Sequence, residues 1–333
     1  MAPKIFLTGA TGFIGGDVLY LLSQQHPDWQ WTCLVRDSEK AAKVSAKYPN
    51  AIMAIGSLDD VDLIEKEAAT ADIVIHTAFS DEHQPSAEAI AKALAQRQSD
   101  RPAYWLHTSG FLSLASESLT TKVFGDRLDK VYDDWDGLNE LTSHPDHVPH
   151  RHVEKVVLAA GSDVVKTAII SPSVVYGKGR GPDKTTGFPL FGTFAKHGRV
   201  FAAGKGENIW HNIHVQDLSE IYLLLAEAAV SGKPAAKWND EGYYLAENGS
   251  YIVKEMLTFA ACIGFDKGLL QSPEVAFLSP DEANRILPYA HIMLGANSRG
   301  RAFRAKRLLG WSPRNPSFED EIENAFTREV ENQ

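Results

Sequence analysis

The sequence has little cysteine, no surplus of positive charge and no long hydrophobic run, and each absence excludes a class of protein. Its 333 residues include two cysteines, too few for a disulfide framework and typical of a reducing compartment. The net charge of −10 argues against a nucleic-acid partner, because a phosphate backbone binds basic surfaces. No apolar run approaches the roughly 20 residues of a membrane-spanning helix. Because an apolar segment begins within a few residues of Met1, we expect no targeting peptide. These features predict a soluble, cytoplasmic protein that binds neither nucleic acid nor membrane.

The most informative segment is rich in glycine and directly follows the apolar run Ile5-Phe6-Leu7. Gly9 permits a tight turn, Gly12 lets backbone N–H groups approach a phosphate, and Gly15 lets the following helix lie close to the strand. A helix N-terminus also attracts anions. The segment therefore predicts a dinucleotide-binding turn, although its spacing is G-x-x-G-x-x-G rather than G-x-G-x-x-G. The cofactor contacts that we expect from it are Thr8, Gly9, Thr11, Gly12, Phe13, Ile14 and Gly15.

Strand and helix patterns alternate through the first half of the chain. Strands are predicted at Lys4–Thr8, Gln30–Val35, Ala51–Ile55, Ala71–His76, Ala103–His107 and Val164–Ile170. Helices are predicted at Gly12–Gln25, Ser38–Lys47, Val61–Ala69, Ser86–Gln98 and Pro149–Ala160. This alternation is typical of an α/β fold with a doubly wound parallel sheet, which binds ligands beyond the carboxyl ends of its strands.

Two features break this rhythm. A connection of about 40 residues runs from Ser109 to Val148, much longer than usual, and its aromatic and acidic residues suggest a loop packed over the site. After Ser171 the chain becomes rich in glycine and proline and then helical again. The later helices are expected at Asp217–Ala229, Val253–Ile263, Pro280–Ile286, Gly300–Leu309 and Phe318–Val330. We predict a dinucleotide-binding domain of residues 1–180 plus 208–247, and a smaller substrate-binding lobe of residues 181–207 plus 248–333.

The tip of the second predicted strand bears on the choice of cofactor. An acidic residue there binds the adenosine ribose of NAD, whereas a basic residue suits the additional phosphate of NADP. Arg36 is the tip residue, so the sequence favours NADP, with Lys40 or Lys43 as helpers. The alternative is NAD, with Arg36 in solvent and Asp37 on the ribose.

Several further motifs resemble those of the extended short-chain dehydrogenase/reductase family, which includes nucleotide-sugar epimerases, dehydratases and dihydroflavonol reductases. They occur in the family's order: His76-Thr77-Ala78, His107-Thr108-Ser109, S-P-S-V-V-Y-G at 171–177, H-V-Q-D-L at 214–218 and L-G-W-S-P at 309–313. The resemblance implies a Rossmann-type fold, a nicotinamide cofactor and a catalytic role for Ser109. It also implies cofactor contacts from Ser57, Leu58, Thr77, Ala78, Lys155, Pro172, Val174 and Val175.

The chain departs from this family at its catalytic Tyr-x-x-x-Lys pair. Lys155 stands at the lysine position, where it would hold the nicotinamide ribose, but Arg151 replaces the tyrosine. Arginine cannot donate a proton near neutral pH. A histidine beside this helix start could carry the proton instead, the candidates being His147, His150 and His152. Alternatively, Lys155 has a lowered pKa, Arg151 binds an anionic group of the substrate, or Arg151 pairs with an acid of the long loop.

The remaining expectations concern ligands and function. The histidines between 144 and 152 do not share a helix face, so we expect no metal site. Substrate contacts are expected from Phe79, His83, Phe111 and Trp210, with His211 and Phe188 approaching from the second lobe. The resulting hypothesis is an NADP-dependent oxidoreductase acting on a carbonyl, hydroxyl or activated double bond of a small apolar or aromatic metabolite. The alternatives are a non-redox isomerase, epimerase, cyclase or lyase that retains the cofactor, and a catalytically silent NADP-sensing protein. The family resemblance is also compatible with a homodimer.

Overall fold

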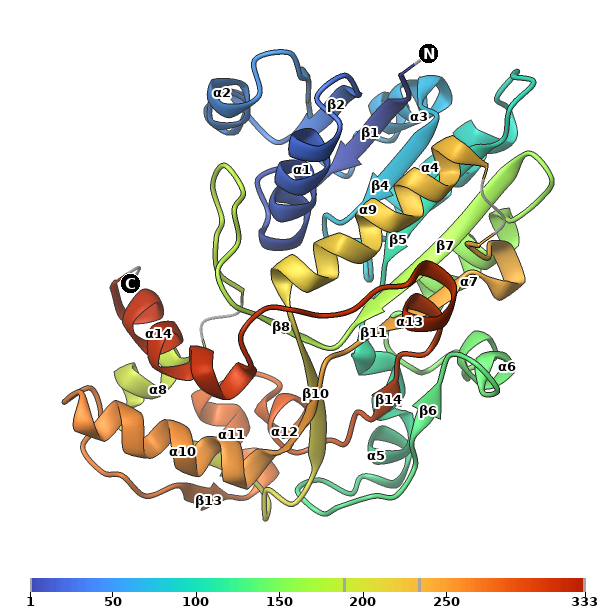
Figure 1. Ribbon diagram of the computed structural model, residues 1–333. Helices are drawn as coiled ribbons and strands as arrows, with labels where there is room; N and C mark the ends of the chain where they lie inside the picture. Colours follow the sequence, from blue (N-terminus) through green and yellow to red (C-terminus); the bar gives the residue numbers. More distant parts are fainter. Residues whose placement is uncertain (1, 188–189, 233–234, 332–333) are drawn as a thin grey trace.

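Seven short strands form one parallel sheet in the order β11-β7-β5-β4-β1-β2-β3 (Figure 1). The structure, a computed structural model, describes residues 2–187, 190–232 and 235–331. The strands are β1 (Lys4–Thr8), β2 (Gln30–Val35), β3 (Ile52–Ile55), β4 (Ile73–His76), β5 (Ala103–Thr108), β7 (Val165–Pro172) and β11 (Tyr243–Ala246). The order reverses at β1, as in doubly wound sheets, and this confirms the predicted fold class.

The six predicted strands are all present, with ends that differ by one or two residues. The seventh, β11, has only four residues, all buried, and it pairs with β7 through Tyr243 and Ile169. Its local sequence carries no alternation of polar and apolar residues that would indicate a strand. The neighbouring strand β7 decides its conformation, because the edge of β7 presents unpaired backbone groups.

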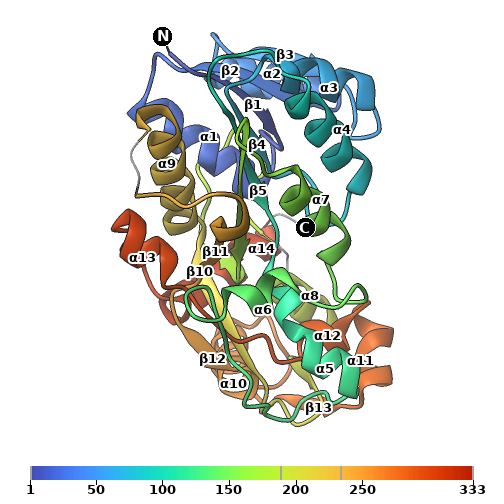
Figure 2. The same cartoon turned by 90° about the vertical axis from the view of Figure 1, so that its right-hand side faces the viewer.

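Helices cover both faces of the sheet, so the strands are apolar on both sides. One face carries α1 (Phe13–Gln25) and α9 (Val215–Ser231), and the other carries α3 (Val61–Thr70), α4 (Gln84–Ala95) and α7 (Arg151–Ala160), as Figure 2 shows. The helix α2 (Ser38–Lys47) connects β2 to β3. Among the described residues, no helix is both long enough and apolar enough to span a membrane.

A second region with its own core lies below the sheet in Figure 1. Its three-stranded sheet contains β8 (Val174–Tyr176), β10 (Ile209–His214) and β12 (Ser250–Ile252), and a two-stranded sheet pairs β9 (Phe201–Ala203) with β13 (Ala276–Leu278). Its helices are α8 (Leu190–His197), α10 (Val253–Asp266), α11 (Pro280–Ile286), α12 (Ala290–Met293) and α14 (Phe318–Glu331). The exact domain boundaries stay a prediction.

One predicted helix begins later than expected. Gly300 and Arg301 form the strand β14 (Gly300–Arg301), and the helix α13 spans Arg304–Leu309. Strand β14 pairs with β6 (Tyr132–Asp133), which belongs to the long connection after β5. A backbone partner at this position therefore overrides the local helical pattern.

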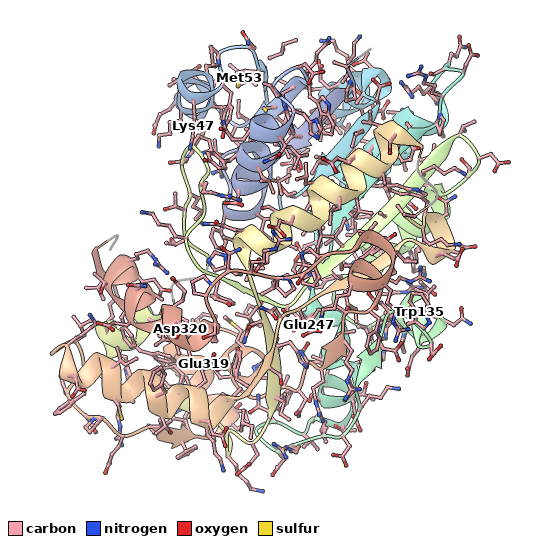
Figure 3. All side chains as sticks on the ribbon, in the orientation of Figure 1. Lys47, Met53, Trp135, Glu247, Glu319 and Asp320 are labelled. Atoms are coloured by element: carbon pink, nitrogen blue, oxygen red, sulfur yellow. The ribbon has the colours of Figure 1, made fainter. Side chains whose placement is uncertain are left out.

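The long connection after β5 is a folded segment. It contains a 3₁₀ turn at Phe111–Ala115, α5 (Ser116–Thr121), β6 and α6 (Leu138–Thr142). Its Trp135 lies against α13, with the guanidinium groups of Arg304 and Arg307 at 6.0 and 4.6 Å from the ring centre (Figure 3). Such cation–π contacts attach the connection to α13.

Asp134 is the fully buried acid that ties this connection to the rest of the fold. Its Oδ1 accepts hydrogen bonds from the backbone N–H groups of Phe303 (2.7 Å) and Arg304 (3.1 Å), and its Oδ2 accepts one from Leu245 (3.0 Å). One carboxylate therefore joins the connection to both α13 and the edge strand β11.

We expect Asp134→Asn to lower the free energy of unfolding by about 2 kcal/mol, because the amide N–H₂ would face a backbone N–H and leave a buried donor unpaired. Urea unfolding measures this change. Asp136→Asn is the matched control, since Asp136 is exposed in the same loop, and its effect should stay within about 0.5 kcal/mol. Equal stability of the two variants would contradict the role of Asp134.

Candidate active site

The turn between β1 and α1 has no space for side chains at its glycines. Gly9 adopts φ +88°, and a Cβ built on it would lie 2.5 Å from Thr77 Oγ1. A Cβ on Gly12 would lie 3.1 Å from the Gly9 oxygen, and one on Gly15 would collide with that oxygen and with Thr77 Oγ1. Gly12 is the N-cap of α1 and provides no side chain to its N–H groups. The turn is therefore suited to an anionic ligand that approaches the backbone closely.

Thr8 and Thr77 join the two strands beneath this turn. Thr77 donates its hydroxyl to the Thr8 carbonyl (2.7 Å), and Thr8 Oγ1 accepts from the N–H groups of Thr77 (3.1 Å) and Ala78 (3.2 Å). These bonds hold the carboxyl ends of β1 and β4 together. The predicted cofactor contacts from Thr8, Thr77 and Ala78 therefore lie side by side.

The residues predicted to contact the adenosine lie at the ends of β2 and β3. Arg36 is exposed, and within the described residues it forms no hydrogen bond or ion pair. Asp37 caps α2, because its Oδ1 accepts from the Lys40 N–H at 2.8 Å. Ser57 accepts from the Asp59 N–H at 3.1 Å, and Leu58 packs against the core under α3. Arg36 is thus the side chain of this corner that is available to a ligand.

The geometry corrects the expected positions of Arg151 and Lys155. Lys155 is exposed on the outer face of α7, where its Nζ donates to Asp146 at 2.9 Å. Arg151 lies on the same outer face and lines a shallow hollow with Lys155, Leu158 and Asp240. The structure therefore does not bring either side chain to Ser109. As their i, i+4 spacing predicts, Arg151 and Lys155 share one face of α7, but that face is the one directed away from the sheet.

The inner face of α7 carries Glu154, which stands one position before Lys155, the residue that the family motif led us to expect there. Glu154 is fully buried, and its Oε1 accepts from the hydroxyls of Ser109 (2.6 Å) and Tyr243 (2.7 Å). Burial raises the pKa of Glu154, against the lowering effect of these two hydrogen bonds. Its Oε2 has no partner among the described residues. Ser109, predicted as catalytic, thus donates its hydroxyl to a carboxyl group that the sequence did not single out.

His150 directly precedes α7 and lies on the same side of the helix as Glu154. It is 5% exposed, it adopts the left-handed φ of +68°, and its Nδ1 lies 2.8 Å from Glu82 Oε1. A Cβ built on Gly110 would lie 3.3 Å from His150 Nε2 and 4.0 Å from the Pro172 oxygen. Nε2 therefore lies against Gly110, and it has no hydrogen-bond partner within the described chain.

Burial would lower the pKa of His150, but the hydrogen bond to Glu82 and the charges of Asp81, Glu82 and Glu154 outweigh it and raise the pKa. The two other candidate histidines do not share this position. His147 is exposed and lies 3.1 Å from Thr120 Oγ1 through its Nε2. His152 is partly exposed, with Nε2 3.0 Å from the Glu82 carbonyl oxygen.

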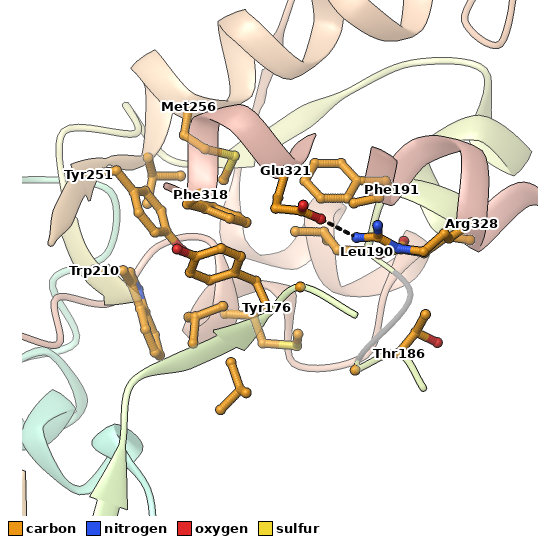
Figure 4. A pocket seen from close by; sticks show the side chains of 18 of the residues that line it. Tyr176, Thr186, Leu190, Phe191, Trp210, Tyr251, Met256, Phe318, Glu321 and Arg328 are labelled. Carbon is orange, nitrogen blue, oxygen red and sulfur yellow. Dashed lines mark hydrogen bonds and ion pairs between the residues drawn. The ribbon is translucent and has the colours of Figure 1, made fainter. Parts of the chain in front are cut away.

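A pocket of about 920 Å³, counted to its open mouth, lies between β8, β10, α8, α10 and α14 (Figure 4). Its wall is mainly aromatic and apolar, with Tyr176, Phe191, Trp210, Tyr251, Met256 and Phe318. The predicted contacts Val174, Val175 and Trp210 line it as well. One end carries the ion pair of Glu321 and Arg328 (2.7 Å). Glu329 also lines the pocket, and burial raises the pKa of its carboxyl group to about 7.

The other predicted substrate contacts are dispersed. Phe79 is 65% exposed and has a φ of +45°, immediately after the cofactor segment Thr77-Ala78. Phe111 is buried in the core of the sheet. His83 caps α4 by accepting from the Ser86 N–H (3.2 Å). His211 is bound to Glu247 at 3.4 Å, and Phe188 lies outside the described residues.

No cluster suited to a metal ion occurs among the residues that the structure describes.

The sequence did carry a signal for the inner face of α7. His150, Val153, Glu154 and Val157 follow the spacing i, i+3, i+4 and i+7 of one helix face, and the two valines mark that face as buried. Glu82 and Tyr243 come from distant segments and carried no comparable signal.

Comparison with known proteins places this geometry in a family. The model of the NAD-dependent epimerase/dehydratase family matches residues 5–239. The chain is 34% identical to the oxidase ucsJ of an Acremonium species, over 99% of both chains. It is also 30% identical to the uncharacterized protein YLL056C of Saccharomyces cerevisiae, over 69% of this chain and 72% of that protein.

Solved structures show the same fold at low sequence identity. UDP-glucose 4-epimerase of Thermotoga maritima, solved with UDP-glucose, has a TM-score of 0.66 and 17% identity over 98% of this chain and 99% of the other. The dTDP-glucose 4,6-dehydratase of Bacillus anthracis, solved with NAD, has a TM-score of 0.67 and 15% identity over 100% and 98%. Together with the family model and the 34% identical relative, this likeness confirms the resemblance noted in the sequence. The chain belongs to the NAD-dependent epimerase/dehydratase family, the extended short-chain dehydrogenase/reductases.

Proposed function

We propose that the chain is an NADP-dependent oxidoreductase that interconverts a carbonyl and a hydroxyl group on a small apolar or aromatic molecule, with His150 as the proton carrier. The observation that supports it most directly is the buried His150, whose Nδ1 is held by Glu82 while its Nε2 lies beside Gly110 with no partner in the described chain. The oxidase relative, similar over its whole length, supports redox chemistry over an isomerase or a silent binding protein.

The cofactor would be held by residues that already fit it. The glycine turn presents backbone N–H groups at the start of α1, and the glycines let the turn pack closely against Thr77, so that a pyrophosphate would meet backbone and no side chains there. Arg36 at the tip of β2 would bind the adenosine 2′-phosphate. When bound, the nicotinamide supplies or accepts the hydride.

His150 would transfer the proton that balances the hydride. The raised pKa favours the protonated ring, and Glu82 fixes the ring through Nδ1, so that Nε2 would donate to the reacting oxygen. Arginine at position 151 is then compatible with catalysis, because Arg151 lies on the other face of α7. Ser109 is a positioning residue in this scheme, since its hydroxyl hydrogen is directed to Glu154.

The substrate class follows from the pocket beside this centre. Pro172 lies next to Gly110, and Val174, two residues further along, lines the aromatic pocket. Two extended residues span about 7 Å. The pocket's reacting end would thus adjoin His150, while its aromatic wall would bury an apolar or aromatic body.

We expect His150→Asn to lower the turnover of apolar aldehydes and ketones with NADPH by roughly a hundredfold or more, because general acid–base transfer is lost. Lys155→Met is the matched control from the same helix, and its turnover should equal that of the native protein, since Lys155 faces solvent. Absorbance of the reduced cofactor measures both. Loss of activity in Lys155→Met with retention in His150→Asn would refute the assignment.

The pH dependence of His150 gives a second prediction. Glu82→Gln removes the hydrogen-bonded charge that raises its pKa, so the pKa of His150 should fall. Carbonyl reduction needs the protonated ring, and its rate is lost as pH rises through this pKa. The descending limb should therefore move to lower pH in Glu82→Gln. NMR titration of ring-labelled histidine measures the pKa without a substrate, and an unchanged value would contradict the proposal.

The cofactor preference is tested at the strand tip. We expect Arg36→Ala to weaken NADPH binding roughly tenfold, because one charge-assisted contact to the 2′-phosphate is lost, and to leave NADH binding unchanged. Fluorescence titration of the reduced cofactors measures both affinities. Equal affinities for NADPH in the native and variant proteins would exclude Arg36 as the phosphate ligand.

A further inference from the structure

The segment of residues 177–187, which we call the strap, leaves β8, runs along α1 and returns towards α8 (Figure 1). It contacts the dinucleotide turn itself. The Lys184 N–H donates to the Thr11 carbonyl at 3.1 Å, and Gly181 lies so close to Gly16 that a Cβ on either would approach the other's Cα to 3.0 Å or less. The strap therefore covers the start of α1, where the pyrophosphate is expected.

A buried ion pair anchors the strap before its tip. Asp17 on α1 is fully buried and accepts from Arg180 through Nη2 (2.6 Å), Nε (3.0 Å) and the backbone N–H (2.8 Å). Ser219 on α9 donates to the same carboxylate at 2.7 Å. A charge pair with this many hydrogen bonds holds a fixed geometry. Arg180 on one side and Lys184 on the other therefore fix the intervening residues in place.

Asp183 lies between these two anchors and points towards α2. Its carboxylate forms ion pairs with both Lys40 and Lys43, the latter at 2.9 Å. All three side chains are partly buried, with 21–37% of each exposed. These are the two lysines that the sequence offers as helpers of Arg36 for a 2′-phosphate. The strap thus brings a carboxylate to the cations that a phosphate would need.

We infer that Asp183 is a specificity-determining residue that competes with the adenosine 2′-phosphate for Lys40 and Lys43 and so limits the preference for NADP over NAD. The inference rests on the proposed function, because it assumes that the corner beside Arg36 receives the adenosine. A phosphate at these lysines would compete with the Asp183 carboxylate and, at Lys43, also with Glu39 at 3.2 Å, whereas NAD brings no 2′-phosphate to them. Arg36 has no internal counter-ion in the described chain and remains available to the phosphate.

Removal of the carboxylate charge tests this competition. Asp183→Asn should tighten the binding of NADPH about three- to tenfold, the size expected when two partly exposed ion pairs no longer compete, and should leave NADH binding unchanged. The fragment 2′,5′-ADP should gain affinity in the same proportion, and 5′-AMP should not. Combination with Lys40→Ala and Lys43→Ala should abolish the gain. Asp126→Asn, which breaks the surface pair with Lys205, is the matched control.

The outcomes separate the inference from the proposed function. Unchanged NADPH affinity in Asp183→Asn, together with a loss in Arg36→Ala, would overturn the role of Asp183 and leave the proposed cofactor standing. Weaker NADPH binding in Asp183→Asn would show that the strap serves only to hold the turn, and would also overturn it. If the native protein bound neither reduced cofactor, the proposed function itself would fail. Measured melting temperatures of Asp183→Asn and Asp183→Ala show whether each variant stays folded, so that an effect of the lost charge can be distinguished from an effect of unfolding.

Discussion

The buried carboxyl group of Glu154 determines how α7 lies against the sheet, and the whole site depends on that orientation. Hydroxyl groups from β5 and β11 both donate to its Oε1, so two strands fix one side of the helix. Successive helix residues differ by about 100° in direction. Once Glu154 faces inward, Lys155 must face solvent. His150, one turn earlier, is then directed towards Gly110, and its left-handed backbone starts the helix there.

This arrangement explains how a member of the family can lack the usual tyrosine. In the proposed scheme, Glu154 and His150, each one position before the family's lysine and tyrosine positions, would act in place of that pair. Glu82 from the loop after β4 provides the counter-charge that raises the pKa of His150 against the effect of its burial. In the proposed scheme, His150 would donate the proton that a tyrosine donates elsewhere in the family.

The strap connects two parts of the molecule that are far apart in the sequence. Asp183 reaches α2, whereas Gly177, Thr186 and Gly187 line the aromatic pocket. The buried pair of Asp17 and Arg180 lies between them. The corner with Lys40 and Lys43 and the aromatic pocket therefore share one short segment of chain.

The parallel sheet, the glycine turn and the basic strand tip could all be predicted from the amino-acid sequence, because each depends on neighbouring residues. Gly9, Gly12 and Gly15 stand within seven positions, and the strands alternate regularly with helices. The sequence also contained the buried face of α7, in the spacing of Val153 and Val157, but the motif with Lys155 favoured the wrong face. Which side chains meet on that face depends on how distant elements pack together. Glu82, Ser109, Glu154 and Tyr243 come from four segments, and Asp183 meets Lys40 across about 140 residues. Such contacts depend on the packing of whole elements, which local periodicity does not encode.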